Sequence, residues 1–476
     1  MSSDPARPAQ SAGTDPDPDL RTAAAKVLRT NDRGTMTVAA PELYPHQWSW
    51  DAAFVAAGLA HLSVPRACVE LDSLLAGQWR TGMIPHIVFS PEAELPYFPG
   101  PEWWRAHELA PAAPAGVLTS GICQPPVHAI GLAQILRIAR ANGGEDARVA
   151  AEFARRIWPA LYAWHRWLIT ARRDSGTGLI AIVHSWESGL DNSPRWDAPY
   201  RAVPTGPLPP YRRRDIGVVD DESQRPSNRE YDRYLWLVEE LKHARYDDAA
   251  IAEHGSFRVG DVFFTAILAV ACEVLAELAD GLEPPLAPHT VIDLRRWAVE
   301  LRAAVAGTVD PATGLARDYD LRSATWIEPD AGGTPGARGA TDTIAGFAPL
   351  LCGGLAADAE RTMLASFDGP DWCGHPDLVV PAPPSTSLRS PALDRRRYWR
   401  GPLWPVAIWL YGEALRRRGF ADRAAALADA GLKLISDGQF AEYYEPVTGE
   451  ALGSSDQSWT AAVALDWLTR QPAPPG

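Results

Sequence analysis

The sequence predicts an all-α protein whose helices form two concentric layers, the arrangement of an α/α toroid. Several segments are apolar on every side, whereas others carry a single apolar stripe. The alternating β-branched runs that are typical of strands are almost absent. Because an all-round apolar helix must be buried and a striped helix lies at a surface, the two kinds together indicate an inner and an outer layer.

The inner layer is predicted by segments that are apolar on all sides. The clearest is 261–278, "DVFFTAILAVACEVLAEL", where after the first residue only Thr265 and Glu273 interrupt the first fifteen positions. The same small-residue, apolar character recurs at 49–62, 128–139, 403–415 and 458–468. Each of these segments is expected to pack against neighbours on every face.

The outer layer is predicted by segments with one apolar stripe. Between 147 and 170, apolar residues recur at steps of three and four: Val149, Phe153, Ile157, Leu161, Trp164 and Leu168. Residues 292–305 repeat this pattern, with arginines on the opposite face. Inner and outer segments together suggest about a dozen helices, the number that six helical hairpins need.

The segments between the expected helices are unusually long, at 83–119, 194–228, 314–340 and 367–402. Long loops inside a compact domain are usually lids or binding loops, and the helix-like 228–246 is assigned to such a cap. We expect a disordered tail over 1–22, one catalytic domain over 23–470 and a short tail over 471–476. Cap insertions are expected around 83–119 and 194–250.

The amino-acid composition excludes several classes of binding partner. The 476 residues carry 45 basic and 59 acidic side chains, a formal charge of −14 that repels nucleic acid and anionic membranes. No apolar run reaches the roughly 18 residues of a membrane helix, and the N-terminus does not resemble a signal peptide. The five scattered cysteines are typical of a reduced cytoplasmic protein. An anionic substrate would need a local arginine in this acidic chain.

Carboxylates in aromatic loops are the main chemical signal. The chain has none of the common serine-hydrolase, zinc or nucleotide motifs. It does have 19 tryptophans, and aromatic and acidic residues gather in "YPHQWSWD" (44–51), "SWESGLDNSPRWD" (185–197), "YWRGPLW" (398–404) and "AEYYEPVTGEALGSSDQSW" (441–459). Aromatic rings bind the C–H face of a sugar and flanking polar groups bind its hydroxyls, so this combination predicts a carbohydrate site.

Hydrolysis of a glycosidic bond with inversion needs one carboxylic acid and one carboxylate base, roughly 6.5–9.5 Å apart. One loop offers Glu187, Asp191 and Asp197, and the other offers Glu442, Glu445, Glu450 and Asp456. Acids on one loop cannot flank a sugar from both faces, so one group must come from each loop. Spacing alone leaves the choice within each loop open.

Seven stretches in order along the chain carry a resemblance to a known family. They are "LYPHQWSWDAAFVAAGLAHL", "MIPHIVF", "GICQPPVHA", "SWESGLDNSPRWD", "RPSNREYDRYLWLV", "YWRGPLWP" and "AEYYEPVTGEALGSSDQSWTAA", between residues 43 and 462. This pattern resembles glycoside hydrolase family 63, most closely its bacterial members that act on glucosylglycerate and mannosylglycerate. The resemblance implies an (α/α)6 barrel with a helical cap, and inverting hydrolysis of 2-O-α-D-glucosyl-D-glycerate to glucose and glycerate, with mannosylglycerate as a further substrate.

The resemblance also implies roles for individual residues. The general acid falls on Asp191 and the general base on Glu442. The sugar contacts fall on Tyr44, Trp48, Ser49, Trp50, Asp51, Gln124, Trp186, Gly189, Tyr398, Trp399 and Trp404. The glycerate contacts fall on Tyr97, Arg225, Tyr231 and Gln457, with Arg225 as the partner of the carboxylate.

Other functions stay open at this point. A trehalase-like enzyme or oligosaccharide α-glucosidase would keep Asp191 and Glu442 but would need no arginine. An isoprenoid cyclase would need a D-x-D-D motif, and a non-catalytic sugar binder would need no second acid. We expect a small sugar substrate with a carboxylate-bearing aglycone and no cofactor, metal, nucleic acid or membrane. Whether the chain forms a homo-oligomer stays open.

Overall fold

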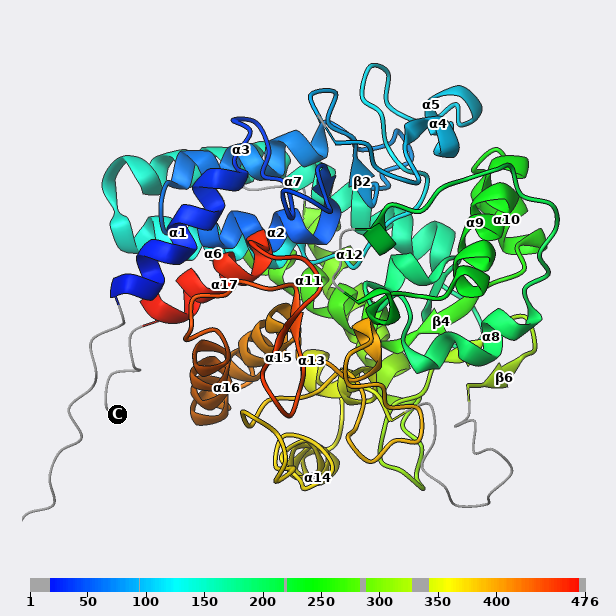
Figure 1. The fold of residues 1–476 in the computed structure, drawn as a ribbon. Helices are drawn as coiled ribbons and strands as arrows, with labels where there is room; N and C mark the ends of the chain where they lie inside the picture. The colour runs from blue at the N-terminus through cyan, green and yellow to red at the C-terminus, as the bar shows by residue number, and fades with distance from the viewer. Residues whose placement is uncertain (1–17, 94, 218–220, 283–287, 328–341, 471–476) are drawn as a thin grey trace, which may run out of the picture.

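The computed structural model describes residues 18–93, 95–217, 221–282, 288–327 and 342–470 of the chain. Within these ranges, six helices form a closed inner ring: α2 (Ser49–Leu59), α6 (His128–Asn142), α11 (Val262–Asp280), α13 (Ala348–Cys352), α15 (Pro405–Arg417) and α17 (Ser458–Thr469). Each contacts the next, and α17 returns to α2. Figure 1 shows these helices around the barrel axis.

An outer helix covers each inner one. The outer helices are α1 (Pro18–Asn31), α3 (Val64–Leu75), α7 (Gly144–Trp167), α12 (Pro288–Ala306), α14 (Ala357–Phe367) and α16 (Ala421–Leu434). They pack on α17, α2, α6, α11, α13 and α15 in that order. The predicted (α/α)6 barrel is therefore confirmed, and the apolar and striped segments occupy the layers expected of them.

Small residues and helix caps explain the close packing of the inner ring. A Cβ on Gly58 of α2 would lie 2.4 Å from the Cα of Ala462 of α17, so only glycine permits this approach. Helix α11 begins where the Asp261 carboxylate accepts the backbone N–H groups of Phe263 and Phe264. Gly58 thus allows α2 and α17 to lie close together, and Asp261 fixes the start of α11.

Helix α11 corrects one expectation about apolar runs. Its 19 residues are long and apolar enough to cross a membrane by length and composition, although the sequence seemed to hold no such run. The helix is instead enclosed by protein, with 89% of its most apolar window buried. All-round burial in the inner ring accounts for its composition.

The N-terminal boundary also needs correction. A disordered tail was expected through residue 22, but helix α1 already begins at Pro18. Its stripe packs on α17, with Leu20, Ala24 and Leu28 buried. The earlier part of the expected tail and the expected C-terminal tail at 471–476 lie outside the described residues.

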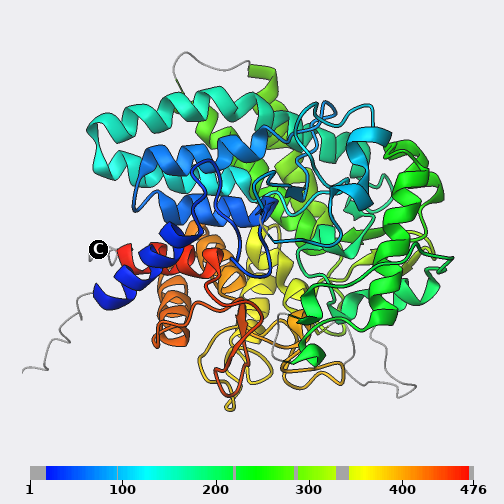
Figure 2. The same ribbon diagram turned by 45° about the horizontal axis from the view of Figure 1, so that its top comes forward.

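Additional short elements gather at one end of the barrel helices. The helices are α4 (Pro101–Trp104) and α5 (Ala106–Leu109) within 83–119, and α8 (Asp197–Ala202), α9 (Asn228–His243) and α10 (Asp248–His254) within or near 194–250. We call residues 228–254, which form α9 and α10, the cap segment. It stands apart from the barrel helices in Figures 1 and 2. A capping box between Ser227 and Glu230 starts α9.

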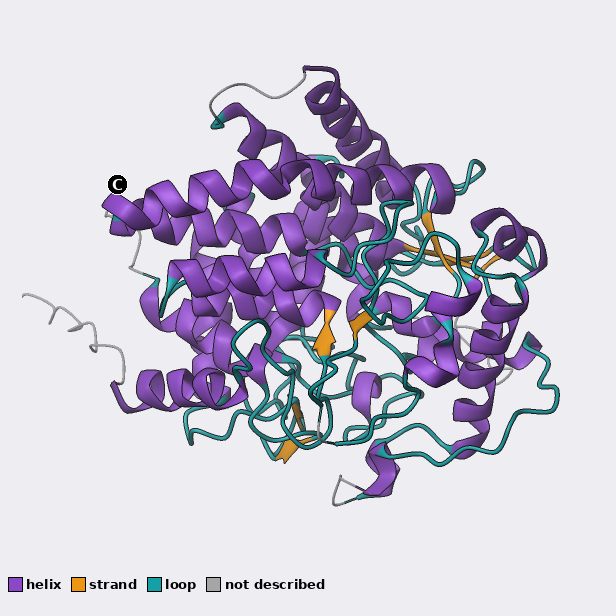
Figure 3. Cartoon of the chain, turned by 90° about the horizontal axis from the view of Figure 1, so that it is seen from above, coloured by secondary structure: helices purple, strands orange, loops and turns teal. Residues whose placement is uncertain are grey.

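The strands are short and lie among the loops (Figure 3). The longest sheet has the order β3 (Ile180–Ile182), β4 (Val259–Asp261), β5 (Tyr319–Asp320) and β6 (Thr325–Trp326), all antiparallel. Two further pairs join β1 (Gln47–Trp48) to β2 (Ile87–Val88) and β7 (Tyr443–Tyr444) to β8 (Ala451–Leu452). Each sheet pins loops that lead into the inner helices.

Candidate active site

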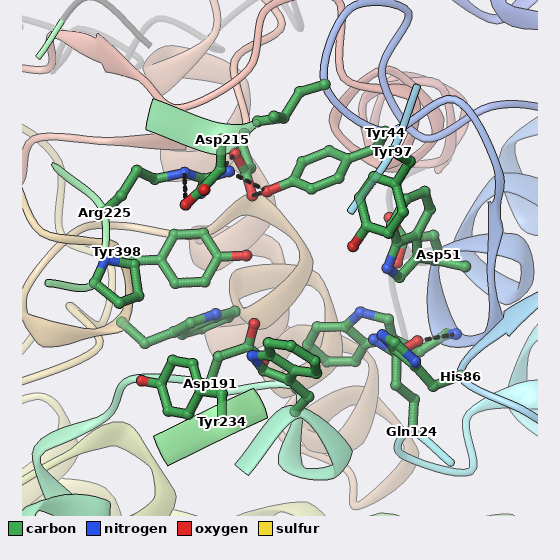
Figure 4. Close-up of a pocket in the computed structure, with 18 of the residues that line it drawn as sticks. Tyr44, Asp51, His86, Tyr97, Gln124, Asp191, Asp215, Arg225, Tyr234 and Tyr398 are labelled. Atoms are coloured by element: carbon green, nitrogen blue, oxygen red, sulfur yellow. Dashed lines mark hydrogen bonds and ion pairs between the residues drawn. The ribbon is translucent and has the colours of Figure 1, made fainter. Parts of the chain in front are cut away.

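A pocket of about 920 Å³, open mouth included, lies at the N-terminal ends of the inner helices (Figure 4). The loops that precede these helices supply its walls. Trp48, Trp50 and Asp51 stand at the start of α2, Gln124 precedes α6, Tyr398 and Trp399 precede α15, and Gln457 and Trp459 stand at the start of α17. The closed ring therefore brings together motifs that lie far apart in the sequence.

All but two of the predicted site residues line this pocket. They are Tyr44, Trp48, Trp50, Asp51, Tyr97, Gln124, Trp186, Gly189, Asp191, Arg225, Tyr231, Tyr398, Trp399, Glu442 and Gln457. The exceptions are Ser49 and Trp404. Both belong to motifs whose neighbouring residues do reach the pocket.

Ser49 and Trp404 correct the expected sugar contacts. Ser49 is fully buried, and its Oγ lies 3.0 Å from Nε2 of His128 within the barrel core. Trp404 stacks on Trp399 with ring centroids 3.7 Å apart and planes 4° apart. Successive residues of one turn point in different directions, so Ser49 anchors the start of α2 while Trp404 supports the indole of Trp399.

Asp191 lies in a setting that favours a protonated carboxyl. It follows Gly189 in the loop over 185–197, which we call the acid loop, and it lines the pocket with only partial exposure. Burial and the negative charge of Glu442 raise the pKa of Asp191 to about 8, although the Arg225 guanidinium opposes this rise. A carboxyl that stays protonated at neutral pH is able to donate a proton.

Glu442 is held by donors from three directions. The Tyr44 hydroxyl donates to Oε1 at 3.0 Å, and the backbone N–H of Ser454 donates to Oε2 at 3.1 Å. The guanidinium of Arg225 lies 3.8 Å from Oε2. The two tyrosines that follow Glu442 in the sequence take no part in these bonds. This cluster of donors suits a carboxylate that accepts a proton.

Arg225 is buried between two tyrosine rings. Its guanidinium carbon lies 5.7 Å from the Tyr44 ring centre and 5.0 Å from that of Tyr398. Nη2 donates to the Tyr44 hydroxyl at 2.6 Å, and Nε lies 3.9 Å from Asp215. The arginine expected to bind the aglycone therefore also stands beside the base, since one hydroxyl bridges Arg225 and Glu442.

The pocket wall depends on a glycine. Gly189 has φ +72°, and a Cβ there would lie 2.7 Å from Cη2 of Trp50. Trp50 in turn is held by a residue of another motif, because the side-chain oxygen of Gln124 accepts its backbone N–H at 3.2 Å. The turn at Gly189 thus allows the acid loop to approach the indole of Trp50 closely.

The other candidate carboxylates lie outside the pocket, and four of them have structural partners there. Arg172 pairs with Glu187 at 2.9 Å in the core, and Arg400 binds both carboxylate oxygens of Asp197. Glu445 accepts two backbone N–H groups of its own turn, and Arg396 pairs with Glu450. Asp456 is exposed and does not line the pocket. Only Asp191 and Glu442 remain from the two sets.

Eight lining residues were missed from the sequence. They are Leu43, His86, Phe98, Arg214, Asp215, Pro226, Tyr234 and Trp459. Leu43, His86, Pro226, Tyr234 and Trp459 belong to the stretches that carried the resemblance, so those stretches gave a signal. Arg214 ends a run of three arginines, and such a run is more often a solvated surface. Among the described residues, no cluster of His, Cys, Asp or Glu is arranged to hold a metal.

Comparisons with known proteins agree with this geometry. Residues 44–460 match the family described as the mannosylglycerate hydrolase MGH1-like glycoside hydrolase domain. The chain is 54% identical over 449 residues to the glucosylglycerate hydrolase of Mycolicibacterium hassiacum, covering 94% of this chain and 97% of that protein. It is 39% identical to the mannosylglycerate hydrolase of Thermus thermophilus, over 93% of this chain and 99% of that protein.

A solved structure shares the fold. The GH63 mannosylglycerate hydrolase from Thermus thermophilus, crystallised with Tris and D-glycerate, superposes with a TM-score of 0.81 at 39% identity. The superposition covers 94% of this chain and 99% of that one.

Proposed function

The chain belongs to glycoside hydrolase family 63, and we propose that it hydrolyses 2-O-α-D-glucosyl-D-glycerate to glucose and D-glycerate, with mannosylglycerate as a further substrate. The chain is a glycosidase. The observation that carries the proposal is the pairing of Asp191, whose pKa is raised to about 8, with Glu442 across the same pocket. The 54% identity to a glucosylglycerate hydrolase supports glucose as the sugar.

The reaction divides between the two carboxyl groups. Asp191 donates its proton to the glycosidic oxygen as the bond to glycerate breaks. Glu442 accepts a proton from the water that attacks the anomeric carbon from the opposite face. Because attack and departure occur on opposite faces, the α-linked sugar leaves as β-glucose. The Trp48, Trp50, Trp186 and Trp399 indoles supply apolar surface for the sugar ring, and Gln124 and Asp51 supply polar groups for its hydroxyls.

Recognition of the glycerate carboxylate falls to Arg225, aided by the hydroxyls of Tyr97 and Tyr231. Arg214, which is exposed, also lines the pocket. A charge-assisted hydrogen bond to a carboxylate contributes about 1.5–3 kcal/mol, which is enough to separate a charged aglycone from a neutral one.

The proposal includes the cell compartment and the domain organisation of the enzyme. The five cysteines are free and buried, which suits a reducing cytoplasm. We also propose that residues 23–470 form one catalytic domain, in which the insertions at 83–119 and 194–250 serve as the cap.

The test is a substrate panel followed by NMR that resolves the two anomers. The enzyme is incubated with glucosylglycerate, mannosylglycerate, glucosylglycerol and trehalose. We expect fastest turnover of glucosylglycerate with β-glucose released first. Initial release of α-glucose contradicts inversion, and equal turnover of trehalose favours the trehalase-like alternative. Asp191→Asn and Glu442→Gln should each nearly abolish turnover, and activity that survives either change removes that residue from its role.

A further inference from the structure

The acid loop and the cap segment meet at the side chain of Trp186. Its indole lies 5.6 Å from the ring of Tyr234 and 6.2 Å from that of Tyr231, both on α9. The ring of His184 lies closer, at 4.3 Å. Trp186 and the two tyrosines line the pocket, whereas His184 does not. A residue outside the pocket therefore stands at the junction of two of its walls.

Both nitrogens of His184 are engaged, and each reaches a different wall. Nδ1 accepts the backbone N–H of Trp186 at 3.0 Å, which starts the short helix over Ser185–Ser188 in the acid loop. Nε2 lies 3.1 Å from the backbone carbonyl oxygen of Tyr234 in α9. The imidazole is fully buried and thus spans the acid loop and the cap segment.

These partners permit one protonation state. An N–H group faces Nδ1 and a carbonyl oxygen faces Nε2, so the ring must be neutral with its hydrogen on Nε2. The groups around the ring are Trp186, Tyr234 and the imidazole of His86, and no carboxylate contributes to its ionisation. Burial lowers the pKa of His184 to about 3, so the imidazole stays neutral and the bridge persists between pH 5 and 8.

We propose that His184 is a positioning residue that holds the acid loop and the cap segment in register across the scissile bond. This inference rests on the proposed function, in which the glucosyl group lies against Trp186 and Asp191 while glycerate lies against Arg225 and Tyr231. Proton transfer from Asp191 to the leaving oxygen needs the two halves of the substrate in fixed alignment, and small displacements reduce the rate strongly. The imidazole fixes that alignment from behind the wall.

Two amide variants separate the two bonds of the imidazole. His184→Asn places an amide oxygen near the position of Nδ1, so it keeps the bond to the acid loop and loses the bond to α9. His184→Gln places an amide nitrogen near the position of Nε2, so it keeps the bond to α9 and loses the bond to the acid loop. Kinetics are measured with glucosylglycerate and with α-glucosyl fluoride, which has no aglycone for the cap and leaves without a proton from Asp191.

The two variants should fail in different ways with glucosylglycerate. We expect His184→Asn to raise KM about three- to tenfold, because α9 is no longer held at its position beside the acid loop, whereas the acid loop keeps its shape. We expect His184→Gln to lower kcat by a similar factor, because the acid loop loosens. His184→Asn should hydrolyse α-glucosyl fluoride within about twofold of the wild-type rate, and His184→Gln should lose less on the fluoride than on glucosylglycerate because only glucosylglycerate needs the proton of Asp191. Nitrogen-15 shifts of the histidines should also show His184 with its hydrogen on Nε2 between pH 5 and 8.

Three results overturn the inference. Equal losses by both variants on both substrates, with a parallel fall in Tm, would make His184 a stabilising core residue only. Wild-type kinetics in both variants would remove any role, and a hydrogen on Nδ1 would remove the bridge. Failure of the wild-type enzyme on glucosylglycerate instead contradicts the proposed function, so the two failures are distinguishable.

Discussion

Asp191 keeps its proton because two effects act in the same direction on one carboxyl group. Burial disfavours its charged form, and the nearby Glu442 adds electrostatic repulsion. Only the protonated form donates to the leaving group, so kcat/KM for glucosylglycerate should fall as the pH rises through about 8. A pH profile from 5 to 10 checks this. A profile that is flat across pH 7–9 would contradict the assignment of Asp191 as the acid.

The same raised pKa predicts a cost in stability. A carboxyl whose folded-state pKa is raised from 3.8 to about 8 contributes stability that is present at low pH and is lost as the pH rises through about 8. Asp191→Asn carries no charge to bury, so its free energy of unfolding should gain about 4 kcal/mol on that of the wild type between pH 5 and pH 9, because each pH unit between the two pKa values is worth about 1.4 kcal/mol. Denaturant unfolding at pH 5 and 9 measures the difference, and a gain that does not grow with pH would count against the raised pKa.

Arg225 should discriminate by the charge of the aglycone. Arg225→Met removes the guanidinium but keeps much of the apolar chain between Tyr44 and Tyr398. The ratio of kcat/KM for glucosylglycerate over glucosylglycerol should fall by about 10- to 100-fold. The ratio is the readout because Arg225 also lies 3.8 Å from Glu442, so activity on both substrates is expected to drop. An unchanged ratio would exclude Arg225 as the carboxylate partner.

The position of a single residue in the pocket could be predicted where the residue belongs to a long motif and its side chain lines the pocket. Asp191 and Glu442 meet this condition, and so do Trp48 and Trp50. Ser49 and Trp404 show the limit, because neighbours in one turn point into different spaces. Asp215 was missed because its loop carries no motif of the family. Its place beside Arg225 follows from the fold of the chain around α9.

At the scale of the element, a substitution at Gly189 tests how closely the acid loop must approach α2. A methyl group there would both strain φ +72° and meet Trp50 at 2.7 Å. Gly189→Ala should therefore lower kcat/KM more than tenfold and destabilise the fold by about 2–3 kcal/mol. Gly34 offers a matched control, since it has φ +85° with no atom within 4 Å of the added carbon. Gly34→Ala should cost about 1 kcal/mol and leave activity unchanged, and similar losses for both would assign the effect to backbone strain alone.

The helices that could be predicted from the sequence are the long ones with a regular spacing of apolar residues. The all-round apolar run of α11 and the stripe of α7 each identified their layer, because burial on one or all faces leaves a periodic trace. Helix α13 has five residues and leaves none, although it completes the inner ring between α11 and α15. The start of α1 was misplaced because the proline-rich, polar composition of the tail hid its last five residues, 18–22, which are helical.

At the scale of the whole molecule, one carboxylate joins the inner ring at the end opposite the pocket. Asp466 of α17 accepts hydrogen bonds from Arg137 of α6 at 2.8 Å, from Trp409 of α15 at 2.7 Å and from Arg470 at 2.6 Å. His61, which follows α2, lies 3.2 Å away. These contacts connect α17 to α2, α6 and α15, and Arg470 adds a second bond to α15 through Glu413. Apart from Arg470 four residues on, the sequence gives no sign of this junction, since His61 and Arg137 lie 405 and 329 residues from Asp466.

Asp466→Asn should therefore weaken closure of the barrel without touching the catalytic residues. The side chain is 1% exposed, and its donors hold the pKa of the carboxyl well below its usual value in spite of burial. That stability is present above pH 3.8 and is lost as the pH falls below it. Arg137 would lose its carboxylate partner and Arg470 would keep only Glu413, so we expect a loss of about 2–4 kcal/mol at pH 7 that shrinks towards pH 3. Thermal unfolding between pH 3 and 7 measures this loss of stability. Asp280→Asn is the control, because the Asp280 carboxylate pairs with Arg295 at the surface. This control should change stability by about 0.5 kcal/mol or less. None of these residues lines the pocket, so kcat of Asp466→Asn at 25 °C should stay within about twofold of the wild-type value. A large fall in kcat without a fall in Tm would contradict this and would show that the two ends of the ring are coupled.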